Sequence, residues 1–145
     1  MNHRHPDSKI LIDLPADGGY GRFREESLHA VSLGSDLYEV LNVPLLATEL
    51  HLHDIVRCAS GTGLPRVAAV VTPSGFGTAH LIVTEAMDEA AQAALIAALR
   101  RLGCVVERGF GVYGIGVPPT LDRAVVGALL DDAYDQGHVT YEAHW

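Results

Sequence analysis

The sequence predicts an α+β protein made of two units, a β-rich N-terminal unit and a C-terminal unit in which two helices alternate with four strands. Two observations support this prediction. Short β-rich runs alternate with turn residues throughout residues 9–76. In residues 77–145, two apolar stripes with helical spacing each stop at a glycine, and each is followed by a strand-like run.

The expected strands of the first unit are separated by residues that favour turns. Asp17-Gly18-Gly19 and Gly34-Ser35-Asp36 are turn sequences, and Pro44 ends a strand because proline cannot donate to a ladder. Residues 45–52 suit either a short helical turn or an extended crossing. The predicted strands are residues 9–15, 26–33, 37–41, 54–59 and 66–72. They predict a small barrel-like, partly open or curled sheet.

The second unit has the order strand, helix, strand, strand, helix, strand, with strands at residues 78–84, 104–107, 112–117 and 138–143. Asp88 is suited to cap the start of the first helix, and Gly103 is suited to end it. In the second helix, Thr120 is suited to cap the start and Gly137 to end it. The residues expected to face the core are Ala91, Leu95, Leu99 and Leu102 in the first helix, and Leu121, Val125, Leu129 and Ala133 in the second.

Right-handed crossovers place both predicted helices on one face of a four-stranded antiparallel sheet, which is the ferredoxin-like arrangement. Either the N-terminal unit or a second copy of the chain is expected to cover the other face, and a second copy would make the protein a homodimer. We therefore expect a flexible tail over residues 1–8, a β-rich subdomain over 9–76 and a ferredoxin-like subdomain over 77–145, with the two subdomains packed together.

Charge and composition limit the function. The chain carries a formal net charge of −8 and one lysine, Lys9, and its arginines are scattered apart from Arg100-Arg101 at a helix end. Nucleic acid is therefore not an expected partner, because phosphate binding needs clustered cations. No run is apolar enough to span a membrane, and no export signal is present, so we expect a cytoplasmic protein whose Cys58 and Cys104 are reduced thiols rather than zinc ligands.

Histidines form the sharpest local pattern, in His51-Leu52-His53-Asp54. In a strand, His51 and His53 would point to the same face. Together with His29 or His80 they could bind a metal or act as acid and base near neutral pH, but spacing fixes no third ligand. Exposed polar residues beside an apolar core are the expected alternative, and we predict no metal and no cofactor.

Two glycine-rich runs carry further candidate residues. Ser74, Phe76, Thr78 and His80 lie where the two units join, a plausible floor for a ligand cleft, although no nucleophile elbow surrounds Ser74. The run from Gly109 to Gly116 contains GxGxxG, but it is expected to be a strand and not a dinucleotide-binding turn. Its glycines would allow a close backbone approach, and Tyr113 would then stack on or hydrogen-bond to a ligand.

Carboxylates supply a candidate acid. Glu107 and Glu142 follow equivalent helices in the two halves of the second unit. If they met across a sheet face, one pKa would rise and that carboxyl could act as an acid.

Several short motifs resemble a bacterial family, the domain of unknown function DUF4265. The matching residues are Glu26-Ser27-Leu28, Gly34, Tyr38, Leu41-Asn42-Val43-Pro44, Asp54-Ile55-Val56, and Ser74-Gly75 with Thr78. This chain has His29, His53, Phe76 and His80 where the family has Trp, Gly, His and Arg, so any shared site would have changed chemistry here. The resemblance implies a small bacterial cytoplasmic protein, and it implies no activity.

The sequence favours a non-catalytic protein that binds a small molecule, a peptide or a protein partner, in an immunity-type or pathway-accessory role. The alternative is a small cofactor-free enzyme using His and Glu acid–base chemistry in a cleft between the subdomains, and the sequence does not decide between them. The candidate ligand-binding residues are His29, His53, Ser74, Phe76, Thr78, His80 and Tyr113.

Overall fold

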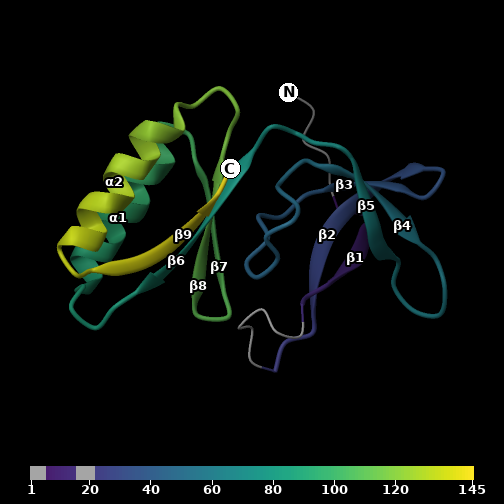
Figure 1. The fold of residues 1–145 in the computed structure, drawn as a ribbon, viewed down its shortest axis with the longest axis horizontal. Coiled ribbons are helices and arrows are strands. Elements are labelled where there is room, and N and C mark those ends of the chain that lie inside the picture. Colours follow the sequence, from purple (N-terminus) through teal and green to yellow (C-terminus); the bar gives the residue numbers. More distant parts are fainter. Residues whose placement is uncertain (1–5, 16–21) are drawn as a thin grey trace. The chain divides into compact units, whose positions relative to one another are not determined.

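The computed structural model describes residues 6–15 and 22–145, and the chain divides into two compact units, Met1–Ser74 and Gly75–Trp145 (Figure 1). The prediction of a mixed α+β protein with two helices is confirmed. The predicted turn at Asp17-Gly18-Gly19 and the first five residues of the predicted tail lie outside the described residues. Within the described part of that tail, the backbone N–H of Asp7 donates to Ala30 O at 3.2 Å.

The first unit is a five-stranded sheet in the order β1-β2-β3-β4-β5, which closes on itself because β1 also contacts β5. Its strands are β1 Ser8–Asp13, β2 Glu25–Gly34, β3 Leu37–Val40, β4 Ile55–Ala59 and β5 Arg66–Thr72. Consecutive strands pair antiparallel, whereas β1 and β5 meet in a parallel contact at Leu11 and Arg66. Ile10, Leu28 and Val56 are among the fully buried side chains that fill the interior.

Local chemistry explains the connections of this unit. Ser35 and Asp36 have φ values of 54° and 62°, the left-handed conformation that a tight hairpin between two twisted strands requires. Residues 45–52 form an irregular crossing that contains neither helix nor strand. Because Leu46, Ala47 and Leu50 of this crossing are buried with the strand residues, the crossing is part of the core and not a surface loop.

The second unit is a four-stranded antiparallel sheet in the order β7-β8-β6-β9 with two helices. Its elements are β6 Gly77–Val83, α1 Glu89–Leu102, β7 Val105–Gly109, β8 Val112–Val117, α2 Arg123–Asp135 and β9 Val139–His144. Leu99 of α1 and Leu130 of α2 are fully buried in the same core as Leu81 and Ile115 of the sheet. Both helices therefore cover one face of the sheet, as Figure 1 shows.

The two helices end in the same way, as the glycines predicted. Asp88 accepts a hydrogen bond from Ala91 N at 2.7 Å and caps α1. After α1, Gly103 has a φ of 107° and Cys104 N donates to Leu99 O at 3.1 Å; after α2, Gly137 has a φ of 75° and His138 N donates to Ala133 O at 3.0 Å. A left-handed glycine thus lets the next amide reach a carbonyl that the helix leaves unpaired.

The start and register of α2 correct the prediction. Asp122, not Thr120, caps this helix, and its carboxylate accepts from Ala124 N at 2.9 Å. Leu121 N donates to Pro118 O at 3.1 Å, so the residues after the two prolines form a turn before the helix can begin. The buried stripe of α2 also differs in part: Val126, Leu130 and Ala133 are buried, while Val125, which was expected in the core, is 45% exposed. Leu121 and Leu129 are partly buried against the same core.

Among the described residues, no helix combines the length and the apolar character needed to cross a membrane.

Candidate functional site

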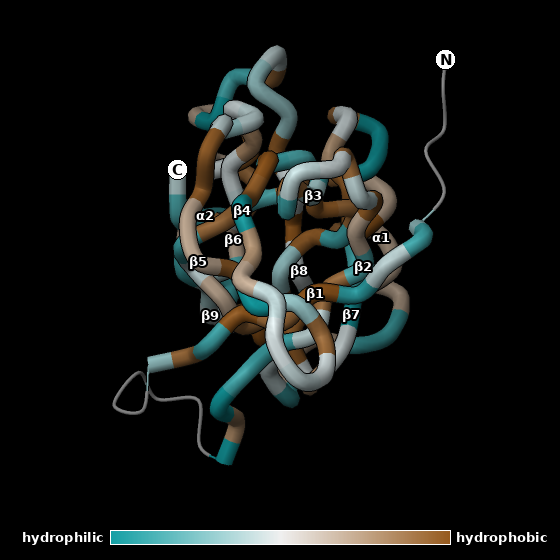
Figure 2. Tube along the Cα trace, turned by 90° about the vertical axis from the view of Figure 1, so that its right-hand side faces the viewer, coloured by the Kyte–Doolittle hydropathy of each residue, from teal (hydrophilic) through white to brown (hydrophobic). Residues whose placement is uncertain are grey.

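Strand β5 is exposed and mostly unpaired along one edge. Within the residues that the structure describes, Leu11 and Arg66 are the one registered pair between β1 and β5, and after it β5 pairs with β4 alone up to Thr72. Apart from the partly buried Val67, every residue of β5 is exposed, including Val70 and Val71 at 36% and 44%. Residues 67–71 are Val, Ala, Ala, Val and Val, the apolar run near the β5 label in Figure 2. An apolar strand with an unpaired edge can pair with another extended chain.

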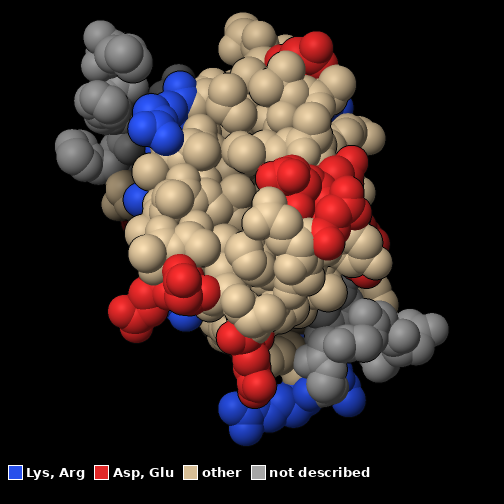
Figure 3. All heavy atoms as spheres, turned by 90° about the vertical axis from the view of Figure 1, so that its left-hand side faces the viewer, with Lys and Arg blue, Asp and Glu red and all other residues tan. Residues whose placement is uncertain are grey.

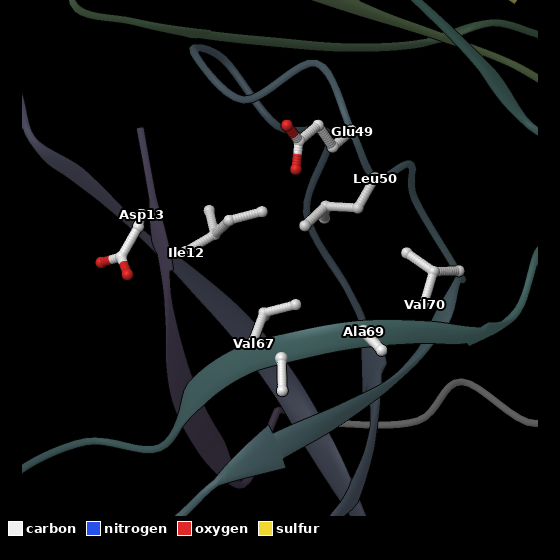
Figure 4. Close-up of a pocket in the computed structure, with 8 residues that line it drawn as sticks. Ile12, Asp13, Glu49, Leu50, Val67, Ala69 and Val70 are labelled. Carbon is white, nitrogen blue, oxygen red and sulfur yellow. The ribbon is translucent and has the colours of Figure 1, made fainter. Parts of the chain in front are cut away.

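A cavity of about 180 Å³ opens where β1 and β5 diverge (Figure 4). Ile12 comes from β1, Leu50 from the irregular crossing and Val67 from β5, and their apolar side chains point toward one another. An apolar cavity of roughly 150 Å³ can hold a benzene-sized group. This cavity therefore has room for one side chain of a segment that pairs with β5.

Negative charge surrounds the cavity mouth. Arg66 pairs with Asp13 at 2.6 Å and with Glu25 at 2.8 Å, so its guanidinium is opposed by two carboxylates. Both neighbours contribute to raising the pKa of Arg66, Glu25 more strongly. Glu49, which lines the cavity together with Asp13, is a third and exposed carboxylate. Three carboxylates against one guanidinium favour a ligand with a cation.

A buried carboxylate fixes the crossing that forms one wall of the cavity. Glu26 is 3% exposed, and its two oxygens accept hydrogen bonds from the backbone N–H groups of Leu45 at 2.7 Å, Leu46 at 3.0 Å and Ala47 at 2.8 Å. A buried carboxylate needs such donors to replace its lost hydration. The crossing is irregular, so Glu26 satisfies amides that no secondary structure pairs.

A second buried carboxylate fixes the other end of the same segment. Asp54 is 2% exposed and accepts from His51 N at 2.8 Å and from Ser74 N at 2.7 Å. The Ser74 hydroxyl donates to Leu52 O at 2.6 Å. Both ends of the segment are therefore held by hydrogen bonds, and the cavity is formed before any ligand arrives.

The prediction that His51 and His53 share one face of a strand is wrong. Residues 51–54 form a turn, and His53 has a left-handed φ of 68°, because Asp54 draws the amide of His51 back toward itself. The His53 Nδ1 atom lies 3.0 Å from Glu39 Oε2. Across the described ranges 6–15 and 22–145, no three His, Cys, Asp or Glu side chains are grouped so that they could hold a metal ion.

In the second unit, two histidines meet on the sheet face that carries no helix. The His80 and His144 rings lie 5.2 Å apart, centroid to centroid. Burial lowers the pKa of His144, and the neighbouring His80 lowers it further. The buried His144 Nε2 makes no hydrogen bond to any residue that the structure describes, and the nearby Glu142 Oε2 is 3.7 Å away.

The expected pairing of Glu107 with Glu142 is not found. The registers place Glu107 opposite Gly114, Gly114 opposite His80, and His80 opposite Glu142. The two carboxylates thus lie on the outer strands of one row, roughly 14 Å apart at three strand spacings. The strand order β7-β8-β6-β9 explains this, because it puts the two strands that follow the helices at opposite edges.

The seven predicted ligand-binding residues are distributed over both units. His29 is exposed on β2, where its backbone N–H donates to Asn42 Oδ1 at 2.6 Å, and His53 and Ser74 lie in the turn and at the end of the same unit. Phe76 precedes β6, and Thr78 and His80 lie on the face of β6 away from the helices. Tyr113 belongs to the core on the opposite, helix-bearing face.

Sequence reasoning named Glu26 and Asp54 only as motif residues and gave them no role, and it missed the exposed cavity residue Glu49. For Glu26 a signal was present: it is in phase with Leu28 and Ala30, so strand periodicity places all three on the inward face. The cysteines are buried free thiols, and burial raises the pKa of Cys104 and raises that of Cys58 to about 11. Neither thiol is activated as a nucleophile.

Comparison with known proteins gives a family and a fold. A family model described as "Domain of unknown function (DUF4265)" matches residues 26–141. The chain is also similar to a hypothetical protein from Neisseria gonorrhoeae with a crystal structure, at a TM-score of 0.79 and 18% identity, over 97% of this chain and 95% of that chain. At this identity the likeness shows the fold alone. A comparison with curated proteins found no match.

Proposed function

This chain belongs to the DUF4265 family, and we propose that it is a binding protein that recognises an extended, basic segment of a partner peptide or protein along the free edge of β5. One observation carries the proposal: an exposed apolar strand, whose second edge pairs within the described residues only at Arg66, borders a preformed cavity. Natural proteins usually protect such an edge with charges, proline, a bulge or a cover, because it pairs readily with other chains. Residues 67–72 contain no charged residue and no proline, and the protection that this edge does carry is two irregularities, where the register with β4 skips Ala68 and Val71.

The chemistry of strand addition suits these features. A segment added to a sheet edge gains affinity from main-chain hydrogen bonds and specificity from pockets that take alternate side chains. The cavity lined by Ile12, Leu50 and Val67 would take one apolar side chain of the segment. A basic side chain beside it would face Glu49, in a protein whose net charge is −8.

Binding of short labelled peptides tests the proposal. We expect saturable binding, measured by fluorescence anisotropy, of a seven-residue peptide that alternates valine with lysine. A counterpart with glutamate in place of lysine should bind at least about tenfold more weakly. A lysine peptide with alternate amides N-methylated should not bind, because it cannot complete the ladder.

Charge reversal at the rim supplies the matched control. We expect Glu49→Lys to lower the affinity for the lysine peptide and to raise the affinity for the glutamate peptide. Glu85→Lys in the second unit should change neither affinity. If the N-methylated peptide binds as well as the parent, or if both reversals act alike, the β5 edge is not the binding site.

The proposal also includes the fold of each unit, the cellular compartment, the bacterial origin and the oligomeric state. The strand orders support naming the first unit a small barrel and the second ferredoxin-like. Two buried free cysteines support a reducing cytoplasm. The bacterial origin rests on the family resemblance. A homodimer would cover the helix-free sheet face of the second unit with a second copy, and native mass spectrometry would detect it by its mass.

A second candidate, cofactor-free acid–base catalysis, has one observation in its favour. His144 has a buried, unbonded Nε2 atom next to His80, and its lowered pKa keeps the imidazole neutral at pH 7. A neutral, desolvated imidazole can accept a proton from a substrate. The peptide experiment separates this function from the first, since it concerns the other unit.

The lowered pKa of His144 predicts how stability depends on pH. As the pH falls below about 6.5, His144 takes up a proton in the unfolded chain before it does so in the folded chain. The free energy of unfolding therefore decreases as the pH falls from there through the pKa of the folded state. We expect the free energy of unfolding, measured with urea, to fall less between about pH 7.5 and about pH 5 in His144→Gln than in the unchanged protein. His138→Gln is the control, and an equal loss in all three proteins would contradict the prediction.

A further inference from the structure

A groove of about 820 Å³ runs along one side of α1, within the size range of roughly 300–1,000 Å³ that small-molecule sites occupy. The helix lines it with a single stripe at spacings of three and four: Glu89, Gln92, Ala93, Ile96, Ala97 and Arg100. Arg108 of β7 and Tyr113 of β8 form the opposite wall. Ala93 and Ala97 are small and leave room in this groove, and Ile96 is its buried lining residue.

The two arginines of the groove are not neutralised by carboxylates. Among the described residues, no Asp or Glu forms an ion pair with Arg100 or Arg108, although the chain has 18 acidic and 10 basic residues. The acidic residue of the lining, Glu89, is eleven positions from Arg100, or roughly 16 Å along the helix. Figure 3, which views the helix side of the molecule, shows acidic side chains in separate clusters on a mostly uncharged surface.

Tyr113 and Gln92 hold Arg108 in place, and Gln92 lies three positions from Glu89 and eight from Arg100 on α1. The Arg108 guanidinium lies over the Tyr113 ring, 5.0 Å from its centroid, and Gln92 Nε2 donates to the Tyr113 hydroxyl. Arg100 Nη2 donates to Val106 O at 3.4 Å, a long bond. Stacking orients a guanidinium without using its N–H groups, so Arg108 keeps donors that can bind an oxyanion in the bidentate mode.

From this arrangement we propose that the groove is a binding site for a small organic anion, a carboxylate or phosphate attached to a flat apolar body. The oxyanion binds between Arg108 and Arg100, and the body lies on Ala93, Ile96 and Ala97. The site is independent of the β5 edge, because it lies in the other unit and selects the opposite charge. It gives Tyr113 a positioning role toward Arg108.

Calorimetric titration of the full chain with four probes tests the site. Phenyl phosphate and benzoate should both bind saturably, and the tighter of the two identifies the preferred oxyanion. Inorganic phosphate, which lacks the apolar body, and benzyl alcohol, which lacks the charge, should each bind at least about tenfold more weakly.

Variants locate the binding. Arg108→Gln and Arg100→Gln should each reduce affinity for the better probe at least about tenfold, and Ala97→Leu should block binding by filling the groove. Arg101→Gln removes the adjacent exposed cation that does not line the groove, and it should change affinity less than about twofold. Ala93→Leu repeats the steric test if the Ala97 variant does not fold. The proposal is overturned if neither aromatic anion binds, if inorganic phosphate binds as tightly as phenyl phosphate, or if Arg101→Gln acts like Arg100→Gln.

Discussion

Replacing Glu26 with alanine is expected to lower the free energy of unfolding by about 3–5 kcal/mol, because each buried amide left without a partner costs roughly 1–3 kcal/mol. The carboxylate accepts from three backbone N–H groups, of Leu45, Leu46 and Ala47, and two of these residues are buried. The alanine variant also leaves a void at an inward position of β2. Urea unfolding followed by circular dichroism measures the loss.

Two further variants show whether the hydrogen bonds cause this effect. Glu26→Gln keeps one acceptor oxygen, so it should lose less stability than the alanine variant. Glu49→Gln alters an exposed carboxylate on the same side of the cavity and should change stability by less than about 0.5 kcal/mol. A loss below about 1 kcal/mol for Glu26→Ala would show that the crossing is held by other contacts.

Replacing Asp54 with alanine is expected to cost about 2–4 kcal/mol, since it leaves the amides of His51 and Ser74 unbonded near the core. The turn at residues 51–54 should also loosen, because its left-handed conformation at His53 depends on this carboxylate. We expect limited proteolysis to cut the variant within residues 45–54 while the unchanged protein stays intact.

Glu85→Gln, at an exposed position of the second unit, is the control for a simple change of charge. Asp54→Asn keeps one acceptor oxygen, so its protease resistance should lie between that of Asp54→Ala and that of Glu85→Gln. Equal protease resistance of Asp54→Ala and Glu85→Gln would contradict the account of this turn.

The element order was predictable because local chemistry sets it. Gly34-Ser35-Asp36 gives a hairpin, and Gly103 and Gly137 end two helices, through backbone conformations that do not depend on the rest of the chain. The start of α2 was not predictable in this way. Thr120 and Asp122 are both good caps, and the turn closed by Leu121 N and Pro118 O decides between them.

Much of the candidate sites depends on contacts between distant residues. The cavity exists because β1 and β5 diverge after Leu11 and Arg66, and no local pattern shows this. The sequence places Arg100 at a helix end, and its place in a groove appears only when β7 and β8 fold beside α1. Tyr113 was singled out because its glycine-rich strand would allow a close backbone approach to a ligand; it lines the groove, and its role toward a ligand stays a prediction.

Amide hydrogen exchange of β5 tests the central claim most directly, by comparing the free protein with the protein saturated with the lysine peptide. The amides of residues 67–72 that point away from β4 should exchange rapidly in the free protein and become protected when the peptide is bound. The same amides protected already in the free protein, or unchanged by the peptide, would contradict the proposal that this edge is where the partner binds.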